Sequence, residues 1–218
     1  MSTGPRYNFM RGLHYEAYWR PCFPKFELLA LCGPLQMFGV LKEDFSISLV
    51  AADRGPVPSN QQVEVIAKDS FIDHKPYDIL FVPGGMGTRD QVSNPKLIDW
   101  LKHSAQKAEY VLSVCTGSSL LARSGVLDGF KATTNKAAFD WVRSQGPKVN
   151  WQAKARWVED GKFFTSSGVT AGMDMALGFI AHLHGDAKAK EVAKWSEYQW
   201  HDDPNWDPFA AIHGLVKD

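Results

Sequence analysis

The chain has 218 residues, 44% of them hydrophobic, which suits one large domain with a substantial buried core. Lys plus Arg and Asp plus Glu are equal at 24 each, so the net charge is zero and no basic field is available to attract nucleic acid. Three cysteines, none in a Cys-x-x-Cys pair, exclude a disulfide framework and favour a reducing compartment, the cytoplasm.

Short β-rich runs alternate with amphipathic helical stretches, a pattern typical of a parallel sheet covered on both faces. Residues 1–19 lack the continuous apolar core of a signal peptide, and no later apolar run approaches the ~20 residues of a membrane span. The expected strands are one within residues 14–20, then residues 46–51, 78–82, 110–114 and 163–166. The expected helices are residues 34–41, 94–107, 116–124, 136–144 and 170–184.

Three local features complete the predicted fold. Pro34 and Pro95 are expected at helix starts, where proline is tolerated. Residues 149–157 and 162–164 are expected to form a β-hairpin that turns at Asp160-Gly161. The chain is therefore expected to be a single domain over residues 1–218, with a core at about 14–190 and an irregular C-terminal wrap over 191–218.

Residues 110–120 run from a short apolar stretch through Cys115 into small residues and then a helical pattern. This order predicts a strand, a tight turn and a helix, the arrangement called a nucleophile elbow. The unpaired N–H groups and positive dipole end of the helix favour the thiolate form of a cysteine at that place. Cys115 is therefore the candidate nucleophile, and the alternative is a buried, inert cysteine.

A glycine-rich turn, Gly84-Gly85, follows another expected strand. Consecutive glycines leave main-chain N–H groups free to stabilise negative charge as an oxyanion hole, although a simple strand exit is the alternative. Ligands of open α/β sheets bind at the carboxyl ends of strands, where this turn and Cys115 are both expected.

Five segments together carry a resemblance to a known family: residues 23–34, 82–85, 113–117, 132–135 and 165–174. Over residues 23–209 the chain resembles the ThiJ/PfpI family of the class I glutamine amidotransferase-like superfamily, and within it the isonitrile hydratase-like branch, whose elbow also reads Cys-Thr-Gly. The PfpI-type protease branch has Cys-His instead, so Thr116 leaves a Cys-His dyad without support. The resemblance implies a flavodoxin-like three-layer sandwich, a homodimer, Cys115 as nucleophile, and amides near Gly85 and Thr116 that bind developing negative charge.

Members of this family carry an Asp or Glu four residues before the proline of a Gly-Pro motif, and Ala30 occupies that place here. A carboxyl group beside the thiol can share its proton and later deliver it, which is worth ~10²–10⁴-fold in rate. Glu27 is the candidate substitute for that acid, and a solvated surface charge is the alternative. Asn135, where many relatives have His, either binds substrate or caps the following helix.

The preferred interpretation is a thiol-dependent hydro-lyase that converts an isonitrile, a small electrophilic substrate, to an N-substituted formamide. One alternative is glyoxalase-III-like conversion of an α-oxoaldehyde. Another is a non-catalytic redox or ligand-sensing module with an oxidisable Cys115, and a third is a protein that keeps the fold without the activity. No zinc-site pattern is present, and no cofactor, metal, nucleic acid or membrane is expected as a partner.

Overall fold

The computed structural model of the chain describes residues 15–73 and 77–217. The strands are β1 Tyr15–Pro21, β2 Phe45–Ala51, β3 Gly55–Pro58, β4 Glu64–Ala67, β5 Asp69–Ser70, β6 Ile79–Val82, β7 Tyr110–Val114, β8 Lys131–Ala132, β9 Asn150–Trp151, β10 Trp157–Asp160 and β11 Phe163–Ser166. Seven of them form one sheet in the order β10-β11-β7-β6-β1-β2-β5, in which the β10–β11 pair is antiparallel and the other pairs are parallel.

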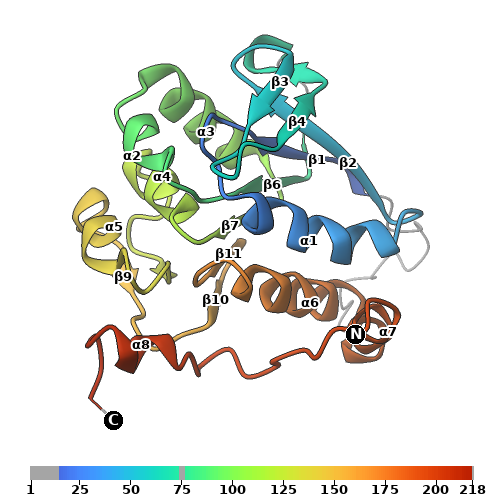
Figure 1. Ribbon diagram of the computed structural model, residues 1–218, viewed down its shortest axis with the longest axis vertical. Coiled ribbons are helices and arrows are strands. Elements are labelled where there is room, and N and C mark those ends of the chain that lie inside the picture. The colour runs from blue at the N-terminus through green and yellow to red at the C-terminus, as the bar shows by residue number, and fades with distance from the viewer. Residues whose placement is uncertain (1–14, 74–76, 218) are drawn as a thin grey trace, which may run out of the picture.

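The helices form two layers around this sheet (Figure 1). They are α1 Leu28–Val40, the 3-10 helix η1 Phe71–Asp73, α2 Thr88–Gln91, α3 Pro95–Lys107, α4 Gly117–Arg123, α5 Phe139–Gln145, α6 Ala171–His184, α7 Asp186–Trp195 and α8 Phe209–Ile212. Helices α1, α6 and α7 pack together in one layer, and α2 to α5 pack together in the other. The fold is the flavodoxin-like α/β sandwich that the sequence predicts. Every helix of the described part of the chain is too short or too polar to traverse a bilayer.

The sheet brings three loops together at one edge. Strand β6 is buried along its whole length, and β7 is buried apart from its first residue, as the continuous apolar runs of both segments predict. Val82 of β6 pairs with Ser113 of β7, and Ser166 of β11 pairs with Val114. Because these strands are parallel, the loops that follow Val82, Val114 and Ser166 leave the same edge side by side.

The predicted start of the first helix is wrong. Helix α1 begins at Leu28, and Pro34 lies inside it. The Leu31 N–H already donates to the Glu27 carbonyl (3.2 Å), so the helix is established before the proline is reached. Pro34 is buried against Gly172 of α6, and a β-carbon added to Gly172 would lie 3.2 Å from the proline ring. This close packing offsets the main-chain hydrogen bond that proline, which lacks an N–H, cannot donate within the helix.

The predicted hairpin exists, but the predicted bounds of its arms are wrong. The arms are β10 and β11, and the turn contains Gly161 with φ +59°. Residues 150–151 instead form β9, which pairs with β8. The helix expected over 136–144 begins at Phe139, because Lys136 is buried and its ammonium donates to Thr133 Oγ1 (2.7 Å) and the Ala155 carbonyl (2.6 Å).

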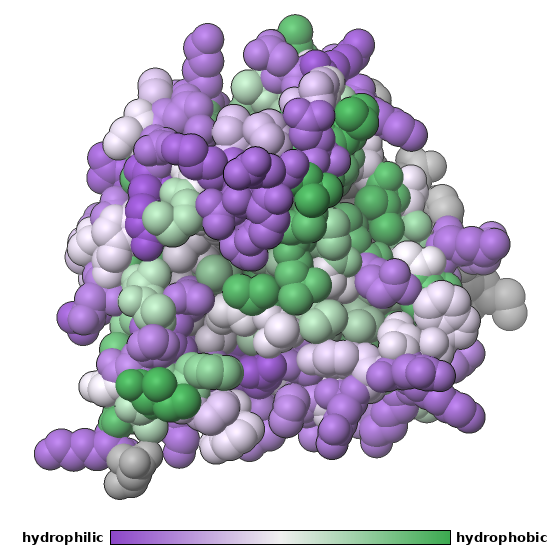
Figure 2. Space-filling model, viewed as in Figure 1, coloured by the Kyte–Doolittle hydropathy of each residue, from purple (hydrophilic) through white to green (hydrophobic). Residues whose placement is uncertain are grey.

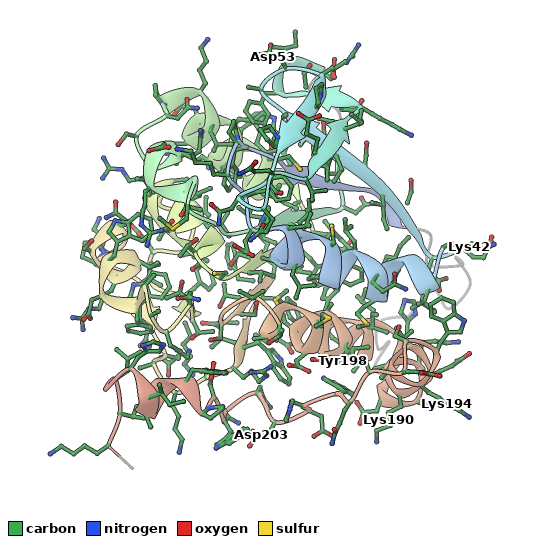
Figure 3. All side chains as sticks on the ribbon, viewed as in Figure 1. Lys42, Asp53, Lys190, Lys194, Tyr198 and Asp203 are labelled. Atoms are coloured by element: carbon green, nitrogen blue, oxygen red, sulfur yellow. The ribbon has the colours of Figure 1, made fainter. Side chains whose placement is uncertain are left out.

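The C-terminal wrap expected over residues 191–218 is irregular only in part, because α7 extends to Trp195 and α8 follows later. The segment between them is attached through Asp174 of α6. The Asp174 carboxylate accepts from Tyr198 Oη (2.9 Å) and the His201 N–H (3.0 Å), and the Arg156 N–H donates to the Pro204 carbonyl (2.8 Å). Figure 3 labels Tyr198 between α6 and this segment. Burial and the Asp174 charge both raise the pKa of Tyr198.

A buried ion pair also holds this segment. Lys136 Nζ lies 3.9 Å from Asp207 Oδ2, both side chains are at most 1% exposed, and Oδ2 has no hydrogen-bond partner among the described residues. Burial lowers the pKa of Lys136 to about 8, and the Asp207 carboxylate opposes this shift.

The free energy of unfolding should depend on this lysine between pH 8 and 10.5. In that range the unfolded chain still binds the Lys136 proton that the folded protein has released, so the contribution of Lys136 to stability increases with pH, by up to about 3 kcal/mol. Urea titrations of the wild type and of Lys136→Met should therefore diverge in favour of the wild type as the pH rises. A difference between the two proteins that stays constant over this range would contradict the expectation.

Candidate active site

The strand, tight turn and helix predicted around Cys115 are present as β7, the turn and α4. Cys115 has φ +58°, a conformation that few residues other than glycine adopt. Its N–H donates to the Ser166 (3.2 Å) and Ser167 (3.0 Å) carbonyls, and its carbonyl accepts from Thr134 Oγ1 (2.9 Å) and Ser118 Oγ (3.2 Å). The main chain on both sides of the sulfur is therefore held in place.

The thiol of Cys115 lies in a buried but polar environment. The residue is 6% exposed, and the main-chain N–H groups of Thr116 and Val169 both interact with the sulfur. Burial nevertheless raises the pKa of Cys115, the charge of Glu27 raises it further, and the two amides only partly oppose this. The N–H group at the helix start does favour the thiolate, as expected, but desolvation outweighs it and the net shift of the pKa is upward.

Val169 is a site residue that the sequence reasoning missed. It lies in the loop between β11 and α6 and has φ +39°, a strained conformation for a β-branched residue. This backbone directs its N–H to the sulfur of Cys115. No local signal in the sequence identifies it, because the loop meets the elbow only through the parallel pairing of β7 with β11.

The two glycines of the predicted oxyanion turn lie against the elbow. A β-carbon on Gly84 would lie 2.6 Å from Thr116 N and 2.7 Å from Cys115 Cβ, so this close approach requires glycine. The Gly85 N–H donates to Thr116 Oγ1 (3.0 Å), and Thr88 Oγ1 lies 3.1 Å from the same hydroxyl. A substrate oxygen that used the Gly85 N–H would have to replace the Thr116 hydroxyl.

Glu27 is held near the elbow by its position at the start of α1. It is the N-cap residue, with an extended backbone, three residues before the buried Ala30. Its N–H donates to the Gly84 carbonyl (2.9 Å). Its charge raises the pKa of the Cys115 thiol, but its carboxylate is hydrogen-bonded to Gln61 rather than to the sulfur.

Asn135 lies beside the elbow and has the geometry of a local cap. Its Oδ1 accepts from the Ala138 N–H (3.0 Å), and its Nδ2 lies against Gly168, where a β-carbon would come within 2.5 Å. It also lines a cavity of about 200 Å³. The other lining residues are Lys136, Ala137, Ser167, Gly168, Val169, Thr170, Phe209 and His213. Val169 thus contacts both this cavity and the thiol.

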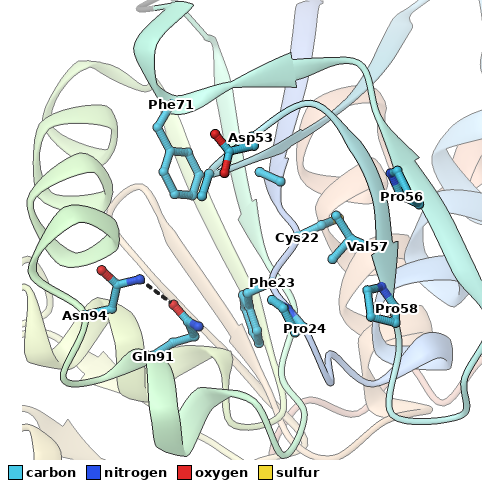
Figure 4. A pocket seen from close by; sticks show the side chains of 12 residues that line it. Cys22, Phe23, Pro24, Asp53, Pro56, Val57, Pro58, Phe71, Gln91 and Asn94 are labelled. Carbon is cyan, nitrogen blue, oxygen red and sulfur yellow. Dashed lines mark hydrogen bonds between the residues drawn. The ribbon is translucent and has the colours of Figure 1, made fainter.

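A second cavity, of about 210 Å³, lies at the carboxyl ends of β1 and β2 (Figure 4). Phe23, Pro58 and Phe71 give it apolar walls, and Gln91 and Asn94 form a hydrogen-bonded pair at one side (2.8 Å).

Within the residues that the structure describes, no cluster of three or more His, Cys, Asp and Glu side chains is arranged to hold a metal ion.

Comparisons with known proteins agree with this arrangement. Residues 21–182 match the model of the DJ-1/PfpI family. The isonitrile hydratase of Pseudomonas putida is 36% identical over 176 residues, which are 81% of this chain and 75% of that protein. The transcriptional regulator CdhR of Pseudomonas aeruginosa is 29% identical over 183 residues, 82% of this chain but only 54% of the regulator.

A solved structure gives the same result. A ThiJ/PfpI family protein from Pseudomonas syringae superposes with a TM-score of 0.79 at 30% identity, covering 91% of this chain and 81% of that one. The family model spans well over half of the present sequence and includes the elbow, the glycine-rich turn and the start of α1. The chain therefore belongs to the DJ-1/PfpI family.

Proposed function

We propose that the protein is a thiol-dependent hydro-lyase that adds water to an isonitrile and releases an N-substituted formamide. The observation that carries the proposal is the Cys115 sulfur, held on a strained turn between the N–H groups of Thr116 and Val169, where the Glu27 charge acts on it. The similarity to an isonitrile hydratase over 81% of the chain supports the choice of substrate.

The first chemical step is addition of the thiol to the terminal carbon of the isonitrile. Because its raised pKa keeps Cys115 protonated at rest, the S–H proton has to move as the bond forms. The Glu27 carboxylate accepts this proton and delivers it to the same carbon. One S–C bond and one C–H bond form, the S–H bond breaks, and the product is a thioimidate, R–N=CH–S–Cys115.

The second step is hydrolysis of that thioimidate. Glu27 accepts a proton from water as the water oxygen bonds to the carbon, and the proton passes to the nitrogen. The C–S bond then breaks, the hydroxyl proton returns to the sulfur, and the N-substituted formamide leaves. The N–H groups of Thr116 and Val169 stabilise the negative charge that develops on the departing sulfur.

The site favours this function over a redox sensor. Oxidation of a sensing cysteine proceeds through an accessible thiolate, whereas Cys115 is 6% exposed with a raised pKa. Asn135 and Val169 line a cavity of about 200 Å³, which has room for a small N-substituent on the side of the elbow where Val169 lies. A glyoxalase-III-like reaction would use the same sulfur on a carbonyl carbon.

Incubation of the protein with isopropyl isonitrile should yield N-isopropylformamide with repeated turnover, because the thiol is regenerated in each cycle. Proton NMR of the reaction mixture detects the formyl hydrogen. A parallel incubation with methylglyoxal, followed for lactate, tests the glyoxalase alternative. Formation of lactate without formamide, or of neither product, would contradict the hydratase assignment.

The organisation as one domain over residues 1–218, the homodimer, the absence of nucleic acid as a partner and the cytoplasmic location stay predictions. The similarity to the transcriptional regulator CdhR makes the prediction of no nucleic acid partner the one most in need of a test.

Apolar side chains gather near α1 and the β3–β4 hairpin in Figure 2, where Leu29 is 41% and Ile66 57% exposed. A dimer contact would give these side chains a partner.

A further inference from the structure

The tip of the β3–β4 hairpin is attached to the segment that precedes α1. The Asn60 N–H donates to the Phe26 carbonyl (2.8 Å), and the Lys25 N–H donates to the Pro58 carbonyl (2.9 Å). Phe26 also pairs with Ser59 as an isolated parallel bridge. These main-chain contacts fix the distance between the hairpin tip and the first residues of α1.

Gln61, at this tip, uses both ends of its side-chain amide on α1. Its Oε1 accepts from the Leu28 N–H (3.0 Å), and its Nε2 donates to Glu27 Oε1 (2.6 Å). The Leu28 N–H is one of the first-turn donors that a helix cannot satisfy itself, and the Glu27 side chain does not cap it. Because the Leu28 N–H needs an acceptor, it must bind the amide oxygen of Gln61, and the amide nitrogen then faces the Glu27 carboxylate. Only one of the two orientations of the Gln61 amide is therefore compatible with both contacts.

We propose that Gln61 is a positioning residue, which fixes the Glu27 carboxylate relative to the Cys115 thiol from a separate hairpin. The inference rests on the proposed role of Glu27 as the proton carrier. A glutamate at a helix start otherwise has three rotatable bonds and turns toward water. The hydrogen bond from Gln61 restricts it to one orientation, and the carboxylate keeps its second oxygen for proton transfer.

The proposal predicts how Cys115 responds to pH when the hairpin contact is removed. Since the Glu27 charge raises the pKa of the thiol, Glu27→Gln should lower the pH at which the iodoacetamide reaction of Cys115 reaches half its maximal rate. Gln61→Ala should lower it in the same direction by a smaller amount, because the carboxylate is released. Added to Glu27→Gln, the Gln61 change should have no further effect.

The measurement uses the full-length protein, with labelling of the Cys115 peptide followed by mass spectrometry across a pH series. Gln62→Ala is the matched control, because Gln62 is the next residue of the same exposed turn and its side chain makes no hydrogen bond in the described structure. This control should keep the wild-type midpoint. Gln61 is exposed, so its replacement opens no core.

Each outcome decides the proposal. An unchanged or raised midpoint in Gln61→Ala, or additive shifts in the double variant, would overturn it, and so would a Glu27→Gln variant with the wild-type midpoint. If isopropyl isonitrile is turned over, Gln61→Ala should also lower kcat about 10-fold with little change in KM. Failure of turnover alone contradicts the hydratase function, whereas the labelling result tests Gln61 independently.

Discussion

Replacing Cys115 with serine should reduce formamide formation from an isonitrile at least about 10³-fold, because the reaction depends on a sulfur nucleophile that is also a good leaving group. A serine hydroxyl is far less acidic than a thiol and leaves poorly from the tetrahedral intermediate. Serine keeps the side-chain geometry and the positive φ of the turn, so the main-chain hydrogen bonds to Ser166 and Ser167 remain. Initial rates measured by NMR compare the two proteins.

Cys32→Ser is the control for this substitution. Cys32 is a partly exposed cysteine of α1, outside the elbow, and its replacement should leave the rate within about two-fold of the wild type. Urea denaturation of both variants checks that the fold is kept. A Cys115→Ser protein that retained a tenth or more of the activity would place the nucleophile elsewhere.

Replacing Asp174 with asparagine should lower the free energy of unfolding by about 3–5 kcal/mol, because it leaves the Arg156 charge buried and unpaired. Arg156 Nε and Nη2 lie 2.7 and 2.6 Å from Asp174 Oδ2, and the two side chains are 8% and 0% exposed. Asp174 also accepts hydrogen bonds from Tyr198 and from the His201 N–H. Urea titration monitored by tryptophan fluorescence measures the loss.

The exposed pair Asp140–Arg143 provides the control. Its atoms approach to 3.0 Å, but its side chains are 75% and 61% exposed, so Asp140→Asn should change the free energy of unfolding by less than about 0.5 kcal/mol. Combining Arg156→Met with Asp174→Leu should recover much of the loss, since no unpaired charge then remains. An effect of Asp174→Asn as small as that of Asp140→Asn would show that the buried pair contributes little.

Features encoded within a few consecutive residues could be predicted from the sequence. The elbow at Cys115 follows from an apolar strand, a small-residue turn and a helical pattern that are contiguous. Asn94-Pro95 predicts the start of α3, where the Asn94 side chain caps the helix. Each strand and helix likewise has its own local pattern, so their alternation along the chain indicated the α/β class.

Features that depend on contacts between distant segments could not be predicted in this way. Pro34 signals a helix start locally, but α1 already begins at Leu28, after a segment attached to the β3–β4 hairpin. The N–H of Val169 reaches the sulfur only because β11 pairs with β7. The low exposure of Cys115 and the resulting rise of its pKa likewise depend on neighbouring segments that are distant in the sequence, such as the loop after β11.

The anchoring of the C-terminal segment has a consequence for exchanging parts between relatives. The family match ends at residue 182, yet Tyr198 and the His201 N–H complete the partners of Asp174, and Asp207 faces Lys136. A chimera that transplanted only the matched region into another scaffold would leave Lys136 without its counter-charge and Asp174 without two of its hydrogen-bond donors. Recombination boundaries that preserve folding therefore lie beyond Asp207.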